Sequence, residues 1–178
     1  TFNDQSVFKN YIEKKEKKSR LLNIDGDQVL EVKEVDGAAF IINKEKFKGK
    51  VMDDKFFMYF ESTDMCFNTL RNNEKIYVIM NIKFDHMGLQ SSEIKYRFEI
   101  IKNRNWHYCW SKFYYYKKNF NFILALSKIT PNIIRSVTTM TKSLIKKDHV
   151  SYEYSKAELS GIRSSLLNKK SYYRPKIS

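Results

Sequence analysis

Apolar residues in the first half of the chain recur at strand spacing in one segment and at helix spacing in another. After a turn signal at residues 23–27, Leu30 and Val32 alternate with charged neighbours, which predicts a half-buried strand. Between residues 63 and 73 the apolar positions fall three and four apart, which predicts a helix that stops at Asn72 and Asn73.

Shorter apolar runs predict further strands. The run at residues 38–42 (Ala-Ala-Phe-Ile-Ile) is uninterrupted, as expected for a fully buried strand, and residues 76–80 predict another strand. Residues 5–20 combine helically spaced apolar positions with many Lys and Glu, which predicts an amphipathic surface helix.

Beyond Ser92 the pattern is mostly helical. We expect Pro131 to start or kink a helix, and two further helical stretches to follow, near residues 133–147 and 152–169. No uninterrupted run of about 18 apolar residues occurs, so a membrane-spanning helix is not expected.

Charge divides the chain into two parts. Residues 1–100 hold 17 Lys and Arg against 17 Asp and Glu, whereas residues 101–178 hold 16 against 3. A basic second part indicates contact with something anionic, such as a membrane surface, a phosphorylated ligand or nucleic acid. The only two cysteines favour a reducing compartment over a disulfide framework.

Three motifs follow one another in the first 92 residues. They are Val-Asp-Gly-Ala-Ala-Phe-Ile-Ile at 35–42, Asp-Lys-Phe-Phe-Met-Tyr-Phe-Glu-Ser-Thr-Asp-Met-Cys at 54–66, and His-Met-Gly-Leu-Gln-Ser-Ser at 86–92. This order resembles the second half of family 2 glycosyltransferases of the rhamnosyltransferase type. The resemblance extends from about residue 29 to about residue 120.

The resemblance implies an α/β fold: the C-terminal half of a GT-A-type nucleotide-diphospho-sugar transferase domain with a mixed sheet, followed by a helical basic tail. We therefore expect residues 1–120 to form the distal, acceptor-side part of that domain and residues 121–178 to form the tail. The family's nucleotide-binding half, with its Asp-x-Asp motif, has no counterpart here, and Asp25-Gly26-Asp27 lies too close to the acceptor-side strand to supply it.

The implied chemistry is an inverting single displacement. A carboxylate takes the proton of the acceptor hydroxyl while that oxygen attacks the anomeric carbon, and a divalent cation, Mn or Mg, bound mainly by the missing half, neutralises the departing diphosphate. The family motif begins Glu-Asp, and its Asp is the expected base. Here those positions are Glu61 and Ser62, so Glu61 or Asp64 is the candidate catalytic carboxylate. The alternative for Asp64 is a structural helix-start carboxylate.

Other positions match the family by order. His86 is the candidate metal ligand. The candidate substrate-binding residues for the nucleotide-diphosphate sugar donor and the glycan or lipid-linked acceptor are Asp36, Gly37, Tyr59, Gln90 and Ser91. Ordinary turns, caps and core packing remain the alternatives for these positions.

Residues 104–118 interleave aromatic rings with cations, as an interfacial helix does. We therefore expect a cytoplasmic protein, peripheral at the inner face of the membrane, that transfers a hexose or deoxyhexose, rhamnose being typical of the family, to a surface-glycan or lipid-linked acceptor. A non-catalytic fragment or scaffold is the alternative. Nucleic-acid binding is the weaker rival, because the chain has the charge but no recognition motif.

Overall fold

A computed structural model describes residues 21–24, 27–45, 47, 50–83 and 94–175 of the 178-residue chain. The fold is mixed α/β, as expected at this coarse level, and it is mostly helical with a small antiparallel sheet. The chain forms two compact units, Thr1–Lys48 with Met65–His86, and Gly49–Asp64 with Met87–Ser178. Each unit is described by itself.

The first unit, here the sheet unit, contains an antiparallel sheet of strands β1 (Leu21–Ile24), β2 (Asp27–Val32) and β3 (Ile76–Ile79), in that order. Val29 pairs with Leu22 on one side and with Ile79 on the other. The predicted strands at β2 and β3 are confirmed, because alternation buries Leu30 and Val32. Asp25-Gly26, between β1 and β2, lies outside the described residues.

The buried strand predicted at residues 38–42 is wrong. This segment forms no strand, and Ile41 is 97% exposed. An apolar run can form a strand only where a neighbouring strand takes up its backbone hydrogen bonds. In the described sheet, β1 and β3 form the two edges, and neither of them pairs with this segment.

Helix α2 (Glu61–Arg71) confirms the predicted helix and its stop. Asn73 adopts a left-handed conformation with φ 59°. Its N–H donates to the Leu70 carbonyl, and the Glu74 N–H donates to the Thr69 carbonyl, both at 3.1 Å. These two bonds form a Schellman ending, in which Asn takes the place usually held by Gly.

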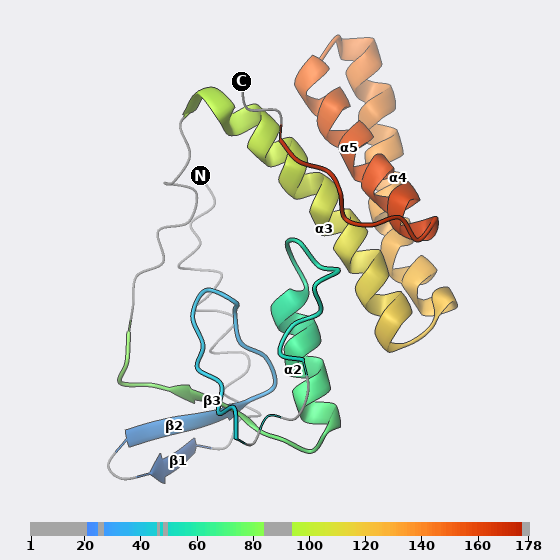
Figure 1. Ribbon diagram of the computed structural model, residues 1–178. Coiled ribbons are helices and arrows are strands. Elements are labelled where there is room, and N and C mark those ends of the chain that lie inside the picture. The colour runs from blue at the N-terminus through green and yellow to red at the C-terminus, as the bar shows by residue number, and fades with distance from the viewer. Residues whose placement is uncertain (1–20, 25–26, 46, 48–49, 84–93, 176–178) are drawn as a thin grey trace. The chain divides into compact units, whose positions relative to one another are not determined.

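The second unit, here the helical unit, is built on α3 (Arg97–Asn119), α4 (Phe122–Lys146) and α5 (His149–Leu166), preceded by the short 3-10 helix η1 (Ile94–Tyr96). The three long helices pack against one another (Figure 1). Their shared core contains Cys109 and Phe113 from α3, Ala125 and Ile129 from α4, and Ile162 from α5.

Helix α4 begins eleven residues before the expected start near residue 133. Asn121 caps it by accepting a hydrogen bond from the Leu124 N–H at 2.8 Å, and the helix continues through Pro131. None of the described helices combines the length and the apolar character that crossing a membrane requires.

Helix α5 lies close to the backbone of α3 at Gly161. A Cβ atom added to this glycine would lie 2.3 Å from the backbone oxygen of Trp106. The indole of Trp106 is fully buried, and its Nε1 donates to Ser160 Oγ at 3.2 Å. The absence of a side chain at residue 161 therefore sets how closely the two backbones approach.

The aromatic stretch at residues 104–118 is helical but is not an exposed interfacial helix. It forms the core of α3, where Trp106, Trp110, Phe113 and Tyr115 are buried. These four buried rings are not available to a lipid surface, because they pack inside the helical unit, for example Trp106 against Tyr173 and Phe113 against Phe122.

The segment after α5 runs back along α3 (Figure 1). Trp110 Nε1 donates to the Lys169 carbonyl at 3.0 Å, and His107 Nε2 donates to the Tyr173 carbonyl at 2.8 Å. Ser171 Oγ donates to the other ring nitrogen of His107 at 3.1 Å. Burial lowers the pKa of His107, and the charge of Arg174 lowers it further, so the imidazole is a neutral core group with both nitrogens paired.

We expect Gly161→Ala to reduce the free energy of unfolding by about 1–3 kcal/mol, because the new methyl group meets backbone that cannot rotate away. Urea denaturation followed by circular dichroism measures the change. Arg163→Ala, on the exposed side of α5, is the control and should have little effect. Equal stability of the two variants would show that the helices can separate at no cost.

Candidate functional site

The loop that leads into α2 holds two consecutive residues in the left-handed region. Tyr59 has φ 68° and Phe60 has φ 65°. This region costs roughly 1–2 kcal/mol for a residue with a Cβ atom, and a bulky ring there is an outlier. Strain of this kind persists where surrounding contacts impose it and is concentrated at functional sites.

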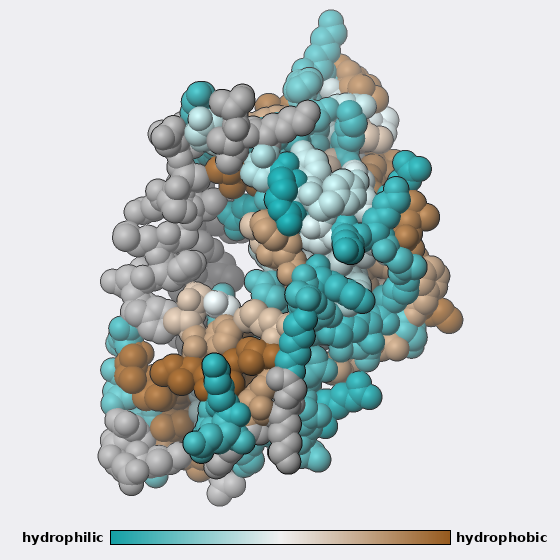
Figure 2. Space-filling model, in the orientation of Figure 1, coloured by the Kyte–Doolittle hydropathy of each residue, from teal (hydrophilic) through white to brown (hydrophobic). Residues whose placement is uncertain are grey.

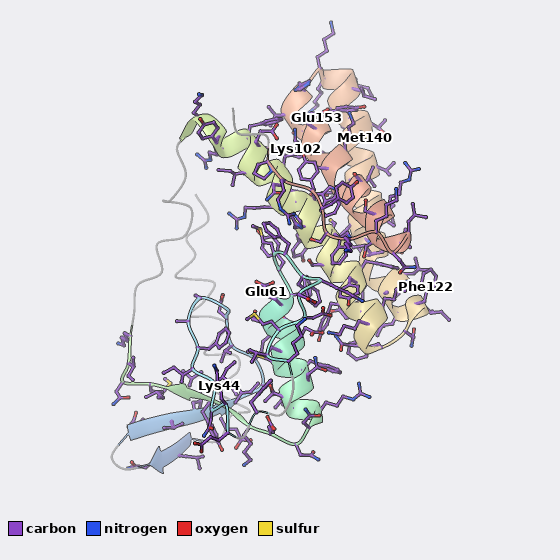
Figure 3. All side chains as sticks on the ribbon, viewed as in Figure 1. Lys44, Glu61, Lys102, Phe122, Met140 and Glu153 are labelled. Carbon is purple, nitrogen blue, oxygen red and sulfur yellow. The ribbon has the colours of Figure 1, made fainter. Side chains whose placement is uncertain are left out.

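Contacts with α3 impose this conformation. Ser111 Oγ donates to the Met58 carbonyl at 2.8 Å, and Arg104 Nε donates to the Tyr59 hydroxyl at 2.6 Å. The Phe60 ring packs against Tyr108, with ring centroids 5.8 Å apart. As a result α2 begins at Glu61, which is labelled in Figure 3.

One carboxylate oxygen of Glu61, Oε2, is buried and has no hydrogen-bond partner among the described residues. A buried acceptor without a donor carries an uncompensated desolvation cost, which native proteins rarely tolerate without a reason. The free oxygen is therefore able to accept a proton or a hydrogen bond from a bound molecule.

Asp64 lies in a different setting, an ion cluster formed with α3. It is 2% exposed, its Oδ2 lies 2.7 Å from Lys118 Nζ, and its Oδ1 accepts from Asn119 Nδ2 at 2.6 Å. Both oxygens thus have partners. Lys118 also contacts Asp53 Oδ2 at 2.8 Å, so one ammonium group bridges two carboxylates.

Tyr114 completes the ion cluster by donating its hydroxyl to Asp53 Oδ2 at 2.8 Å. Burial by itself would raise the pKa of Asp53, but hydrogen bonds from Lys118, the Lys55 backbone and Tyr114 hold that pKa below its ordinary value. Burial and the hydrogen bond to Asp53 raise the pKa of Tyr114, so its hydroxyl stays protonated. Asp64 therefore has a structural environment, and Glu61 is the better placed of the two candidate bases.

A hollow of about 250 Å³ lies beside the strained turn. Its lining consists of the guanidinium of Arg104, the phenol rings of Tyr59 and Tyr108, the amide of Asn105 and the side chain of Ile101. Aromatic rings, an amide and a guanidinium are groups that bind sugar hydroxyls or phosphate oxygens. Tyr59, predicted to bind substrate, is thus two residues from Glu61 and lines a hollow.

Two of the other predicted substrate-binding residues belong to the sheet unit. Asp36 and Gly37 are exposed in a turn of the sheet unit, where the Asp36 carboxylate accepts from the Ala38 N–H at 3.1 Å. His86, Gln90 and Ser91 lie outside the described residues. Among the described residues no group of three or more His, Cys, Asp or Glu side chains could hold a metal ion, so no ligand is assigned there.

Several contributors were not predicted: Asp53, Arg104, Asn105, Tyr108, Tyr114 and Lys118. Sequence spacing could have grouped two of them. Tyr114 and Lys118 are four residues apart and therefore lie on one face of α3. Their partner Asp53 is 61 residues from Tyr114, and no local pattern connects the two.

Comparison with known protein families, curated proteins and solved structures gives no match.

We expect the lowered pKa of Asp53 to make the helical unit sensitive to acid. As the pH falls, Asp53 is protonated in the unfolded chain, where the pKa of Asp is about 3.9, before it is protonated in the folded chain. The stabilisation by Asp53 is therefore present above about pH 4 and is lost as the pH falls through the folded-state pKa.

Urea denaturation at a series of pH values measures this dependence. Asp53→Asn should flatten the loss of stability on acidification. Asp54→Asn is the control, because Asp54 is exposed and pairs with the exposed Lys50, and such pairs contribute little. Parallel acid curves for the natural chain and Asp53→Asn would contradict the ion cluster as described.

Proposed function

We propose that the chain is the acceptor-side half of a nucleotide-sugar-dependent glycosyltransferase of the family 2, rhamnosyltransferase-like type. It would transfer a hexose or deoxyhexose from a nucleotide-diphosphate donor to a surface-glycan or lipid-linked acceptor. The donor site and the divalent cation would belong mainly to a nucleotide-binding half of the GT-A domain that precedes it.

The observation that carries the proposal is the buried oxygen of Glu61 without a partner, at the start of α2 and directly after the strained Tyr59-Phe60 turn. The motif order gives this position to the acceptor side of the transferase. The hollow beside the turn, with Arg104 and two phenol rings, supplies groups that suit a polyhydroxylated acceptor. Tyr59 links the two observations, because it belongs to the strained turn and lines the hollow.

The proposed step is a single displacement. The acceptor hydroxyl transfers its proton to the Glu61 carboxylate while its oxygen forms a bond to the anomeric carbon. The bond from that carbon to the diphosphate oxygen breaks, and the nucleoside diphosphate leaves with the electron pair. Attack from the face opposite the leaving group inverts the anomeric centre.

The first test joins this chain to the segment that precedes it in its gene and titrates both forms with nucleoside diphosphates and manganese by calorimetry. Binding by the longer protein alone supports a transferase whose donor site lies upstream. Binding by neither form supports a non-catalytic scaffold and contradicts the proposal.

In the complete enzyme, Glu61→Gln should lower kcat by about a hundredfold to ten-thousandfold, the contribution of a general base. Nucleotide binding should be unchanged. Asp64→Asn should act mainly on stability, because Asp64 pairs with Lys118 and Asn119. Glu45→Gln, in the exposed part of the sheet unit, is the control.

If Glu61→Gln and Asp64→Asn both leave turnover unchanged, the assignment of the base is wrong. Ser62→Asp gives the converse measurement, because it restores the residue that the family carries. A rise in kcat would indicate that Glu61 is a weaker substitute for that base.

The hollow makes a separate prediction. Arg104→Gln removes the guanidinium and should raise the KM for the acceptor roughly tenfold. Arg97→Gln, an exposed arginine on the same helix, is the matched control. An unchanged acceptor KM for Arg104→Gln would show that the hollow does not bind the acceptor.

A further inference from the structure

The side of α4 that faces away from the helical core exposes apolar residues along the whole helix. Ile123 is 79% exposed, Ile134 58% and Ile145 79%. Val137 and Leu144 are exposed beside them. We call this side of the helix the outer face of α4. An exposed helix surface normally carries charged and polar residues instead.

The polar residues of the outer face are all hydroxyl residues whose hydrogen bonds stay within the helix. Thr130 Oγ1 donates to the Leu126 carbonyl at 2.7 Å, and Thr141 Oγ1 donates to the Val137 carbonyl at 3.0 Å. Ser127 and Thr138 donate to carbonyls of α4 in the same way. The hydroxyls thereby have hydrogen-bond partners without water, which lowers the cost of removing the outer face from water.

Cations follow one edge of the outer face. They occur at Lys128, Arg135, Lys142 and Lys146, which are spaced seven, seven and four residues apart and so lie along one side of the helix. Arg135 pairs with Glu158 of α5 at 2.9 Å. The three lysines are therefore the cations of this edge that we consider for contact with an anionic partner. The sequence of α4 contains no Asp or Glu.

We propose that the outer face of α4 docks onto an anionic lipid surface. An apolar face of Ile, Val, Leu and Thr bordered by lysines is the combination that lies in the interface of an anionic bilayer. Figure 2 shows brown surface along the edge of the helical unit where Figure 1 places α4, and Figure 3 labels Phe122 and Met140 on this helix.

Charge argues against a second copy as the occupant. Antiparallel pairing of two α4 helices would bring their cationic edges together, and parallel pairing would give the cations no carboxylate partner, because α4 contains no Asp or Glu. Anionic headgroups match the lysines directly. The inference depends only on α4 and not on the proposed transferase function, so the two can fail separately.

The experiment is co-sedimentation of the full chain with two kinds of vesicle, pure phosphatidylcholine and equimolar phosphatidylcholine with phosphatidylserine. We expect binding to the anionic vesicles and much weaker binding to the neutral ones. Ile134→Asn/Ile145→Asn should lower the partition coefficient roughly tenfold or more, because two exposed apolar anchors are lost. The matched control is Ile41→Asn/Ile82→Asn, the same change at exposed isoleucines of the sheet unit.

A second pair of variants tests the cationic edge. Lys128→Gln/Lys142→Gln/Lys146→Gln should reduce binding to the anionic vesicles on the order of a hundredfold. Lys44→Gln/Lys83→Gln/Lys170→Gln removes the same net charge elsewhere and should have a much smaller effect. Circular dichroism verifies that each variant keeps its helix content. Ile134→Ser/Ile145→Ser replaces the first pair if that signal changes.

Three results would overturn the proposal. One is an absence of binding to the anionic vesicles. Another is binding that the lysine variant abolishes and the isoleucine variant leaves intact, which would indicate plain electrostatic adsorption. The third is a dimer, seen by sedimentation velocity, that Ile134→Asn/Ile145→Asn dissociates while vesicle binding is unaffected, which would make a second copy the occupant.

Discussion

The helical unit depends on how closely α5 approaches the backbone of α3 at Gly161. Small buried residues accompany this glycine on α5, among them Ala157 and Ser164, so the two helices can pack with little side-chain volume between them. The Trp106 ring beside this contact is then covered by Tyr172 and Tyr173 from the segment after α5. The position of α3 follows from these contacts, and the candidate site is built on α3.

Helix α3 positions the candidate site through two sets of groups. Arg104 and Tyr108 form the hollow with Tyr59, while Tyr114 and Lys118 form the ion cluster with Asp53 and Asp64. The ion cluster and the Ser111 hydrogen bond hold the loop before α2 against the helix. Interactions of this kind offset the backbone strain at the turn and fix the direction in which α2 begins.

Local patterns predicted a strand around Leu30 and Val32, a helix over residues 63–73 and a helical second half, because each segment has a clear period. The structure has β2, α2 and the helices α3 to α5 there. The local patterns failed at Ile41, where an apolar run pairs with none of the described strands. They also failed for the aromatic stretch of α3. Its indole nitrogens find acceptors on Ser160 and Lys169, more than 50 residues away, and sequence spacing cannot reveal such partners.

The candidate site was predictable in part for the same reason. Glu61 and Tyr59 belong to a motif that is continuous in sequence, whereas the lysine that binds Asp64 comes from 54 residues later. The amphipathic pattern of α4 can be recognised from neighbouring residues in the sequence. Which side of the helix is exposed depends on how the helix packs in the folded protein. Only the packing of Ala125 and Ile129 against α3 and α5 determines which face of α4 remains outside.

The two cysteines have a practical consequence. The chain contains only Cys66 and Cys109, one in each unit, and both are buried, at 1% and 0% exposure. Burial also raises the pKa of the Cys109 thiol to about 12, so this thiol is unreactive while the helices are closed. Each unit of the natural chain thus contains one cysteine whose modification reports the opening of that unit. The rates at which a thiol reagent reaches the two sulfurs would compare how often each unit opens.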